Sequence, residues 1–318
     1  MTSRKQASAV MAMLSSLLFA ACGGGGGGTP PAPPPPPPPA PQSQFDVVYG
    51  SGLTNGGSKA LTLDLYQSGA PCTQARPFVM LIHGGGFTGG DKAIGRWPSY
   101  AEEMTDRGYV ALSINYRLQG DQPLPSAEFT PIRDGILAAL EAQNDPEALS
   151  LANTISSAFE DTVRSLRWVE ENAGTHCIDP STFALWGGSA GSYIALAVAY
   201  GMDDFSIAVT KPKVVIDEWG SLIIPNAMTD SDPPLFILHG QNDTVVPYDL
   251  ALQLQQEADA VALPYSFYTV SNGGHGFDTR IVTVDDVPIF ELEARFIDAH
   301  FSGTNADYET RTIPLRGG

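Results

Sequence analysis

The chain has 318 residues, 43% of them apolar, and so can bury a sizeable core. Its 17 Lys and Arg against 35 Asp and Glu give a net charge of −18. Such a surface repels nucleic-acid phosphates and anionic lipid headgroups, so we expect no nucleic-acid partner and attribute the charge to solubility.

The first 22 residues have the features of an export signal. Two basic residues at 4–5 precede an apolar stretch at 9–21, which is as long as a signal-peptide core and too short to span a bilayer comfortably. Phe-Ala-Ala-Cys at 19–22 resembles a bacterial lipobox, in which Cys22 would be lipidated and become the mature N-terminus. Leu is the commoner first residue of that box, so cleavage after Ala21 without lipid is the alternative. We expect an exported lipoprotein, anchored on the periplasmic or cell-surface side of a membrane.

Residues 23–43 have the composition of a linker. A glycine run at 23–28 is followed by an almost pure proline stretch at 30–41. Proline in such runs forms polyproline II, which extends by ~3 Å per residue and would act as a semi-rigid spacer. The sequence that remains suits one domain over 44–302, followed by a tail at 303–318.

Within that domain, hydrophobic patterning predicts strands that alternate with helices, which favours a mainly parallel sheet with right-handed crossovers. The first two strands, joined by Gly- and Asn-rich residues, are the exception and should pair antiparallel. The connection between residues 116 and 159 is unusually long, so we expect an insertion at 119–157 that acts as a lid. Strands are predicted at 45–49, 60–66, 78–82, 109–114, 182–186, 214–216, 235–238 and 265–270, and helices at 100–107, 159–172, 190–200, 247–261 and 287–301.

A glycine run follows the third predicted strand, in the motif His-Gly-Gly-Gly-Phe at 83–87. Glycines let backbone N–H groups face a substrate without side chains in the way. The N–H groups of Gly85 and Gly86, with that of Ala190, would form an oxyanion hole. A phosphate-binding loop is the alternative, but the run lacks a Gly-Lys-Ser/Thr ending and no helix follows it directly.

The motif Gly-Gly-Ser-Ala-Gly at 187–191 lies where a buried strand becomes a buried helix. In that context Gly-x-Ser-x-Gly indicates a nucleophile elbow, a sharp turn that exposes the hydroxyl of Ser189 at the carboxyl end of the sheet. The motif alone is weak, so its strand–helix setting and its downstream partners carry the prediction.

Two later strand ends would supply an acid and a base. Asp243 ends the motif His-Gly-Gln-Asn-Asp, from which a carboxylate can reach a histidine on the next loop. His275, between glycines after the last predicted strand, is the expected base. Asp217, at the end of the preceding strand, is the rival acid. His83 and His239 belong to the glycine motifs and are expected to hold loops by hydrogen bonds.

Three aromatic residues follow these motifs closely and are candidates for lining a substrate pocket. They are Phe87, Trp219 and Phe277. Ordinary core packing is the alternative for each of them.

These motifs together resemble the α/β-hydrolase superfamily over about residues 45–302, in the branch of carboxylesterases and lipases that carry His-Gly-Gly-Gly. The elbow is similar to that of bacterial carboxylesterases and feruloyl-esterase-like members. The resemblance implies an α/β fold with a mostly parallel eight-stranded sheet, helices on both faces and a small inserted lid. The implied strand order is 1-2-4-3-5-6-7-8, with the second strand antiparallel.

The same strand order would place Cys72 and Cys177 at the amino ends of two adjacent parallel strands. An exported protein meets an oxidising compartment, so a disulfide between them is expected. Two free thiols are the alternative.

The expected function is hydrolysis of a small-molecule carboxylic ester through an acyl-enzyme, with Ser189, His275 and Asp243 as the catalytic triad. No metal or cofactor is required for that chemistry. A peptidase or amidase of the same fold is one alternative. A non-catalytic binding protein on the cell surface, built on a hydrolase scaffold, is an alternative of another class.

Overall fold

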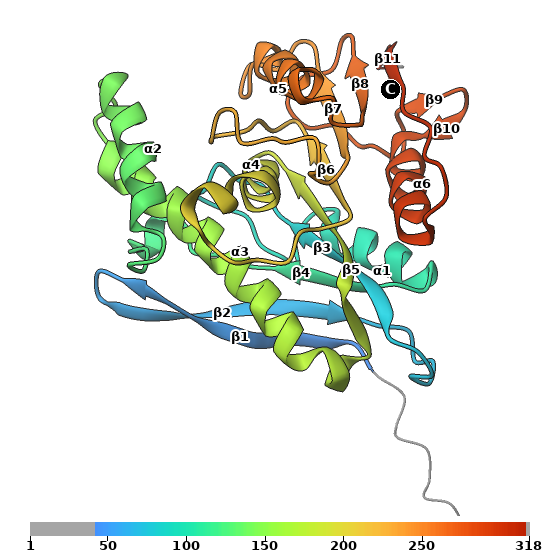
Figure 1. The fold of residues 1–318 in the computed structure, drawn as a ribbon, viewed down its shortest axis with the longest axis horizontal. Coiled ribbons are helices and arrows are strands. Elements are labelled where there is room, and N and C mark those ends of the chain that lie inside the picture. The colour runs from blue at the N-terminus through green and yellow to red at the C-terminus, as the bar shows by residue number, and fades with distance from the viewer. Residues whose placement is uncertain (1–41, 316–318) are drawn as a thin grey trace, which may run out of the picture. The chain divides into compact units, whose positions relative to one another are not determined.

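The computed structural model describes residues 42–315, which Figure 1 shows as a ribbon. The predicted signal peptide at 1–22, its acceptor Cys22 and most of the linker at 23–43 lie outside the described residues, as do 316–318. The expectations of export and lipid anchoring therefore stay predictions.

A nine-stranded sheet crosses the described part of the chain, in the order β1-β2-β4-β3-β5-β6-β7-β8-β11. Strand β2 is antiparallel to both of its neighbours, and the other strand pairs are parallel. The strands are β1 (Gln44–Thr54), β2 (Gly57–Tyr66), β3 (Arg76–Ile82), β4 (Val110–Ile114), β5 (Ile178–Gly188), β6 (Val214–Glu218), β7 (Leu235–Gly240), β8 (Tyr265–Val270) and β11 (Thr310–Ile313), besides a small hairpin of β9 (Thr283–Val284) and β10 (Val287–Pro288).

Helices cover both faces of this sheet. One face packs against α3, α4 and α5, and the other against α1 and α6. The helices are α1 (Trp97–Asp106), α2 (Thr130–Ala142), α3 (Ala148–His176), α4 (Ala190–Leu196), α5 (Tyr248–Val261) and α6 (Ile289–Ser302), with short turns η1 (Gln119–Asp121), η2 (Ala197–Gly201) and η3 (Asp203–Phe205).

The central strands are apolar on both sides because both faces are covered. In β3, Phe78 and Met80 join the core under α3, whereas Val79 and Leu81 join the core under α1 and α6. All four side chains are buried. This alternation with a period of two residues follows from the pleat of a strand, and it explains the continuous apolar run in the sequence.

The predicted α/β fold and strand order are confirmed, with one correction: the sheet has nine strands and not eight. The ninth, β11, comes from the segment expected to be a tail. It pairs in parallel with β8, from Thr310 beside Phe267 to Ile313 beside Val270. The four residues of β11 are too few and too polar to show the hydrophobic pattern of a strand. Their strand conformation depends on pairing with β8.

The insertion predicted at 119–157 contains η1, helix α2 and the first turns of α3. The prediction that this helix begins near residue 159 is wrong, because α3 begins at Ala148. Its early part is rich in Ser, Thr and Asn, which favour helix interiors weakly. The hydroxyls of Thr154 and Ser156 donate to the carbonyls of Ser150 and Ala152 in the preceding turn, at 2.8 and 2.7 Å. The role of this insertion as a lid stays a prediction.

The expected disulfide is present: Cys72 and Cys177 are bonded, with their Cα atoms 5.8 Å apart. They precede β3 and β5, which pair in parallel with Arg76 opposite Ile178. The bond therefore fastens the amino ends of two central strands.

Candidate active site

Ser189 lies on the turn between β5 and α4, with φ 54° and ψ −121°. This conformation is unusual for a residue with a side chain and is typical of strained functional turns. The turn needs glycine at its flanks, because a Cβ on Gly187 would overlap the backbone of Gly191. The Ser189 amide donates to the Glu218 carbonyl at 2.9 Å, which ties the turn to β6. The Ser189 side chain is left partly exposed.

His275 and Asp243 meet this hydroxyl from the loops after β8 and β7. The His275 Nε2 atom lies 2.9 Å from the Ser189 Oγ atom, and its Nδ1 atom lies 2.7 Å from Asp243 Oδ2. The second oxygen of Asp243 accepts hydrogen bonds from the amides of Val245 and Val246 at 2.8 and 2.9 Å. The structure thus joins hydroxyl, imidazole and carboxylate in one relay, in which each carboxylate oxygen has its own partners.

The rival acid, Asp217, is not part of this relay. Its Oδ1 atom accepts from the Gly220 amide at 2.9 Å, behind the elbow. Burial raises the pKa of this carboxyl to about 7, because removal from water penalises its charged form. The acid bonded to His275 is Asp243.

Two further histidines lie at the carboxyl ends of strands near the relay, His239 within β7 and His83 directly after β3. His239 is buried, and its Nε2 atom lies 2.9 Å from the Val246 carbonyl, in the turn that carries Asp243. The His83 ring stacks on Tyr116 with ring centroids 4.4 Å apart. Burial lowers the pKa of both imidazoles, which favours their neutral form.

The glycine run at 83–87 packs directly on the elbow. A Cβ on Gly84 would lie 2.7 Å from the Gly188 carbonyl oxygen and 3.1 Å from the Ser189 Cβ. Both Gly85 (φ 118°) and Gly86 (φ 59°) have positive φ and are exposed. The Gly85 carbonyl accepts from the amides of residues 88 and 89, both at 3.1 Å, which closes a tight turn. This placement is compatible with an oxyanion hole, and the roles of Gly85, Gly86 and Ala190 in one stay predictions.

The three aromatic candidates differ in their surroundings. Trp219 is buried, with its ring centroid 6.4 Å from that of His275 and 4.9 Å from that of Phe277. Phe277 is only half-buried beside it. Phe87 is buried against Tyr116, and its carbonyl accepts from the Gln119 amide at 2.9 Å, so it fastens the insertion to the glycine run. Trp219 lies against His275, and Phe277 lies against Trp219. Their contact with a substrate stays a prediction.

One cluster next to the elbow has no counterpart in the sequence motifs. Arg96, from the loop before α1, forms an ion pair with Glu218, which lies beside Glu293 of α6. Consecutive side chains of a strand point to opposite faces of the sheet, so the side chains of Asp217 and Glu218 in β6 lie on opposite faces. The acidic pair in a buried strand is the one signal in the sequence that could have indicated this cluster.

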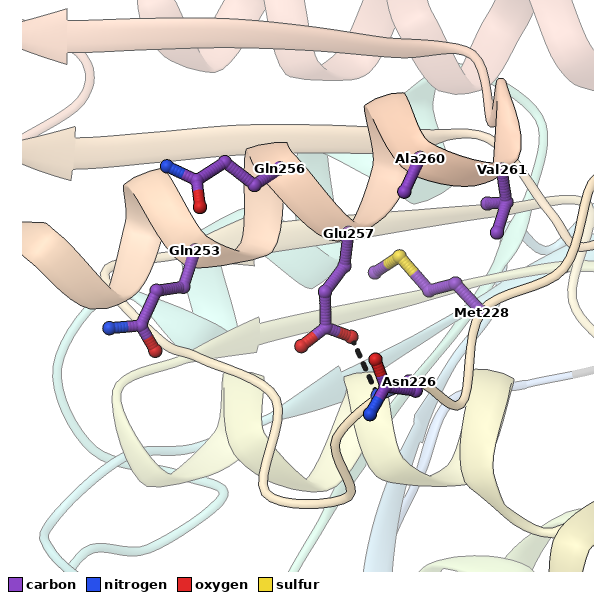
Figure 2. A pocket seen from close by; sticks show the side chains of 7 residues that line it. All are labelled: Asn226, Met228, Gln253, Gln256, Glu257, Ala260 and Val261. Carbon is purple, nitrogen blue, oxygen red and sulfur yellow. Dashed lines mark hydrogen bonds between the residues drawn. The ribbon is translucent and has the colours of Figure 1, made fainter.

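Two cavities lie apart from the relay. One of about 320 Å³ lies between α5 and residues 226–228, where the Asn226 amide donates to Glu257 at 3.0 Å (Figure 2). The other, of about 450 Å³, is apolar and lies between α2 and residues 223–225. Neither is lined by a relay residue. Within residues 42–315, no cluster of His, Cys, Asp or Glu is arranged to bind a metal, and no helix has the length and hydropathy of a membrane span.

Comparisons with known proteins agree with this architecture. Residues 63–136 match the BD-FAE family model, and residues 148–216 match a family model described as alpha/beta hydrolase fold. Phenmedipham hydrolase of Pseudarthrobacter oxydans is 32% identical over 127 residues, which are 39% of this chain and 20% of that protein. Esterase LipQ of Mycobacterium tuberculosis is 23% identical over 73% of this chain and 57% of its own length. The chain thus spans little more than half of these curated relatives at most.

Solved structures share the fold at low sequence identity. Thermogutta terrifontis esterase 2 phosphorylated by paraoxon superposes with a TM-score of 0.61 at 19% identity, over 86% of this chain and all of that one. A truncated carbohydrate esterase from gut microbiota has a TM-score of 0.56 at 18% identity, over 83% of this chain and 97% of that chain. Its strand order, its elbow at the tip of β5 and these matches show that the chain has the α/β-hydrolase fold.

Proposed function

We propose that this protein is a serine hydrolase that cleaves carboxylic esters through an acyl-enzyme. The observation that carries the proposal is the relay of two hydrogen bonds, 2.9 Å from Ser189 to His275 and 2.7 Å from His275 to Asp243. The BD-FAE match, the esterase and hydrolase names of the curated relatives and the esterase structures support the ester as the substrate class.

The reaction follows from the geometry. His275 Nε2 takes the proton of the Ser189 hydroxyl as its oxygen attacks the acyl carbon. The negative charge on the former carbonyl oxygen is stabilised by backbone N–H groups of the glycine run and of Ala190. His275 then gives its proton to the departing alcohol, which leaves an acyl group on Ser189. A water molecule that His275 deprotonates attacks this acyl group, and the acid departs as the proton returns to Ser189.

Asp243 supports each step without exchanging protons itself. It holds the Nδ1–H tautomer of His275, which leaves Nε2 free to accept a proton, and it stabilises the imidazolium that forms. The two backbone amides on its other oxygen fix the carboxylate in place.

Hydrolysis of para-nitrophenyl esters of increasing acyl length tests the proposal, with the Ser189→Ala variant as control. We expect turnover by the wild-type protein and a loss of at least about 10³-fold in kcat/KM for the variant. A phosphonate probe should label wild-type Ser189 stoichiometrically and leave the variant unlabelled.

Three outcomes would contradict the proposal. Full esterase activity of the variant would remove Ser189 from the reaction. Faster cleavage of matched anilides than of esters would favour an amidase. A wild-type protein that binds the esters without turnover would favour a binding protein.

A further inference from the structure

At the elbow, on the face of the sheet that α1 and α6 cover, the position of one side chain is taken by a residue from another loop. Gly188, the residue before Ser189, has no side chain, and a Cβ there would overlap the Nη2 atom of Arg96. The guanidinium of Arg96 thus occupies the space that a side chain beside the nucleophile would otherwise fill.

Aromatic rings and an acid hold this guanidinium in place. Its central carbon lies 4.7 Å from the ring centroid of Trp97 and 4.6 Å from that of Trp219. Its Nη2 atom donates to the carboxylate of Glu218, a residue of β6 with a fully buried side chain. Trp219 also contacts His275, so a single indole ring separates the Arg96 guanidinium from the proposed general base.

The guanidinium retains donors for a ligand. The bond to Glu218 is the one side-chain hydrogen bond that Arg96 donates within residues 42–315. Its Nε atom is buried without a partner, so the donors open to a ligand are those on the exposed 22% of the side chain. Arginine carries five N–H donors in a planar fork, a geometry that matches a carboxylate.

The two acids behind Arg96, Glu218 and Glu293, do not give this site a net negative charge. Glu293, buried under α6, lies next to Glu218, and burial raises the pKa of both carboxyls. Two adjacent carboxylates in a buried site repel each other, which favours a proton on one of them. With one proton on the pair, Arg96, Glu218 and Glu293 together carry no net negative charge, so an anion next to the nucleophile can accept hydrogen bonds from the remaining donors of Arg96 without repulsion from these acids.

We propose that Arg96 is a specificity-determining residue that binds a carboxylate carried by the ester substrate. This inference rests on the proposed ester hydrolysis and adds the substrate class: an ester with a free carboxylate on its acyl half or its alcohol half. The charged group lies against Arg96 while the ester carbonyl lies at Ser189.

Two matched substrate pairs test the inference. On the acyl side, the pair is para-nitrophenyl hydrogen succinate and para-nitrophenyl butyrate. On the alcohol side, it is 4-acetoxybenzoate and 4-methylphenyl acetate. In the Arg96→Met variant, we expect kcat/KM for the carboxylate member of at least one pair to fall by about 10- to 100-fold. The neutral members should change by less than about threefold, since no charged hydrogen bond is lost with them.

Two further variants separate recognition from structure. Arg280→Met is the matched control, because Arg280 also covers aromatic rings, of Tyr100 and Phe290, and pairs with Glu103 on the same face of the sheet. It should leave the selectivity between the members of each pair unchanged. Arg96→Lys keeps a positive charge opposite Glu218 and should retain part of the carboxylate preference in a folded protein.

The results that would overturn the inference are distinct from those that test the proposed function. Equal losses on both members of each pair in Arg96→Met and Arg96→Lys would make Arg96 a structural residue. Unchanged kinetics on all four esters would remove it from the site. A wild-type protein that hydrolyses none of the four would overturn the ester hydrolase function, and this inference with it.

Discussion

The two carboxylate oxygens of Asp243 have separate partners, so replacing one of them changes either the bond to His275 or the bonds to the backbone. One oxygen faces His275, and the other accepts from two backbone amides in the next turn. An amide side chain in this position has one oxygen and one NH₂ group. If the oxygen stays with the backbone amides, the NH₂ group faces Nδ1 and stabilises the wrong imidazole tautomer.

Replacement of Asp243 with Asn should therefore lower kcat for ester hydrolysis by about 10³- to 10⁴-fold, with a small change in KM. Steady-state kinetics on a short-chain para-nitrophenyl ester measures this effect. Circular dichroism and the thermal midpoint show whether the variant is folded.

Asp217→Asn is the matched control, because Asp217 also lies at the carboxyl end of a strand and is buried. Its oxygen bonded to the Gly220 amide can be replaced by an amide oxygen. Its kcat should stay within a few-fold of wild type. A larger loss from Asp217→Asn than from Asp243→Asn would reverse the assignment of the acid.

Some residues of the site could be predicted from the sequence, and others could not. Ser189, Asp243 and His275 follow strands within glycine-rich motifs, so strand patterning alone places them at one edge of a parallel sheet. Arg96 precedes a helix in an unremarkable loop, and its approach to Gly188 depends on how α1 packs on the sheet. No local pattern encodes such a distant contact.

Among the secondary-structure elements, β1, the insertion and α3 are joined by one buried arginine. Arg117 follows β4, and its side chain donates to the carboxylate of Asp161 on α3. It also donates to the carbonyls of Leu53 in β1 and Leu124 in the insertion, both at 2.8 Å. Gly52 has no side chain, which leaves the guanidinium room beside β1.

Replacement of Arg117 with Met should lower the free energy of unfolding by about 3–5 kcal/mol, because the carboxylate of Asp161 would stay buried without its counterion. Urea denaturation followed by tryptophan fluorescence measures this change. Arg164→Met is the control, since Arg164 pairs with Glu160 of the same helix but is 38% exposed. It should cost less than about 1 kcal/mol. Equal effects of both substitutions would contradict the role of the buried network.

The elements differ in how much of them the sequence could predict. The buried strands have continuous apolar runs, so their presence and order in the chain followed from patterning, and their ends shifted by a few residues. The early turns of α3 were missed because Asn153, Thr154 and Ser157 have weak helix propensity. Contact of this part with α2 and with Arg117 overrides that propensity.

For the whole molecule, the disulfide closes a loop between residues separated by 105 positions. In the chain-entropy account, a loop of this length stabilises the folded state by about 4–5 kcal/mol, through its effect on the unfolded chain. Cys72 is exposed and Cys177 is buried, so we expect a reductant to approach the bond from the side of Cys72.

Reduction should therefore lower the thermal midpoint by an amount on the order of 10 °C. Differential scanning calorimetry with and without a thiol reductant measures the shift. A variant with Ser at both Cys72 and Cys177 should melt at the lower temperature in either buffer. An unchanged midpoint in the reduced protein would contradict a stabilising role for the bond.

The strand order of the whole sheet was accessible from the sequence through the resemblance of its motifs to the α/β-hydrolase superfamily, because patterning alone gives the order of the strands along the chain and not their neighbours in the sheet. The strand at the edge beyond β8 could not be predicted from the sequence, since β11 has four residues and only Ile313 is buried. Such a strand is specified by its neighbour and not by its own composition.

Strand β11 has a practical consequence for anyone who shortens this chain. With Thr310–Ile313 in place, the amides of Phe267 and Ser271 donate to Glu309 and Ile313 at 2.8 and 2.9 Å. A truncation before these residues would leave one flank of β8 without partners, in a strand rich in aromatic and β-branched residues. Exposed flanks of that kind can recruit strands from other molecules, so we expect a chain truncated before β11 to aggregate more readily than the full chain.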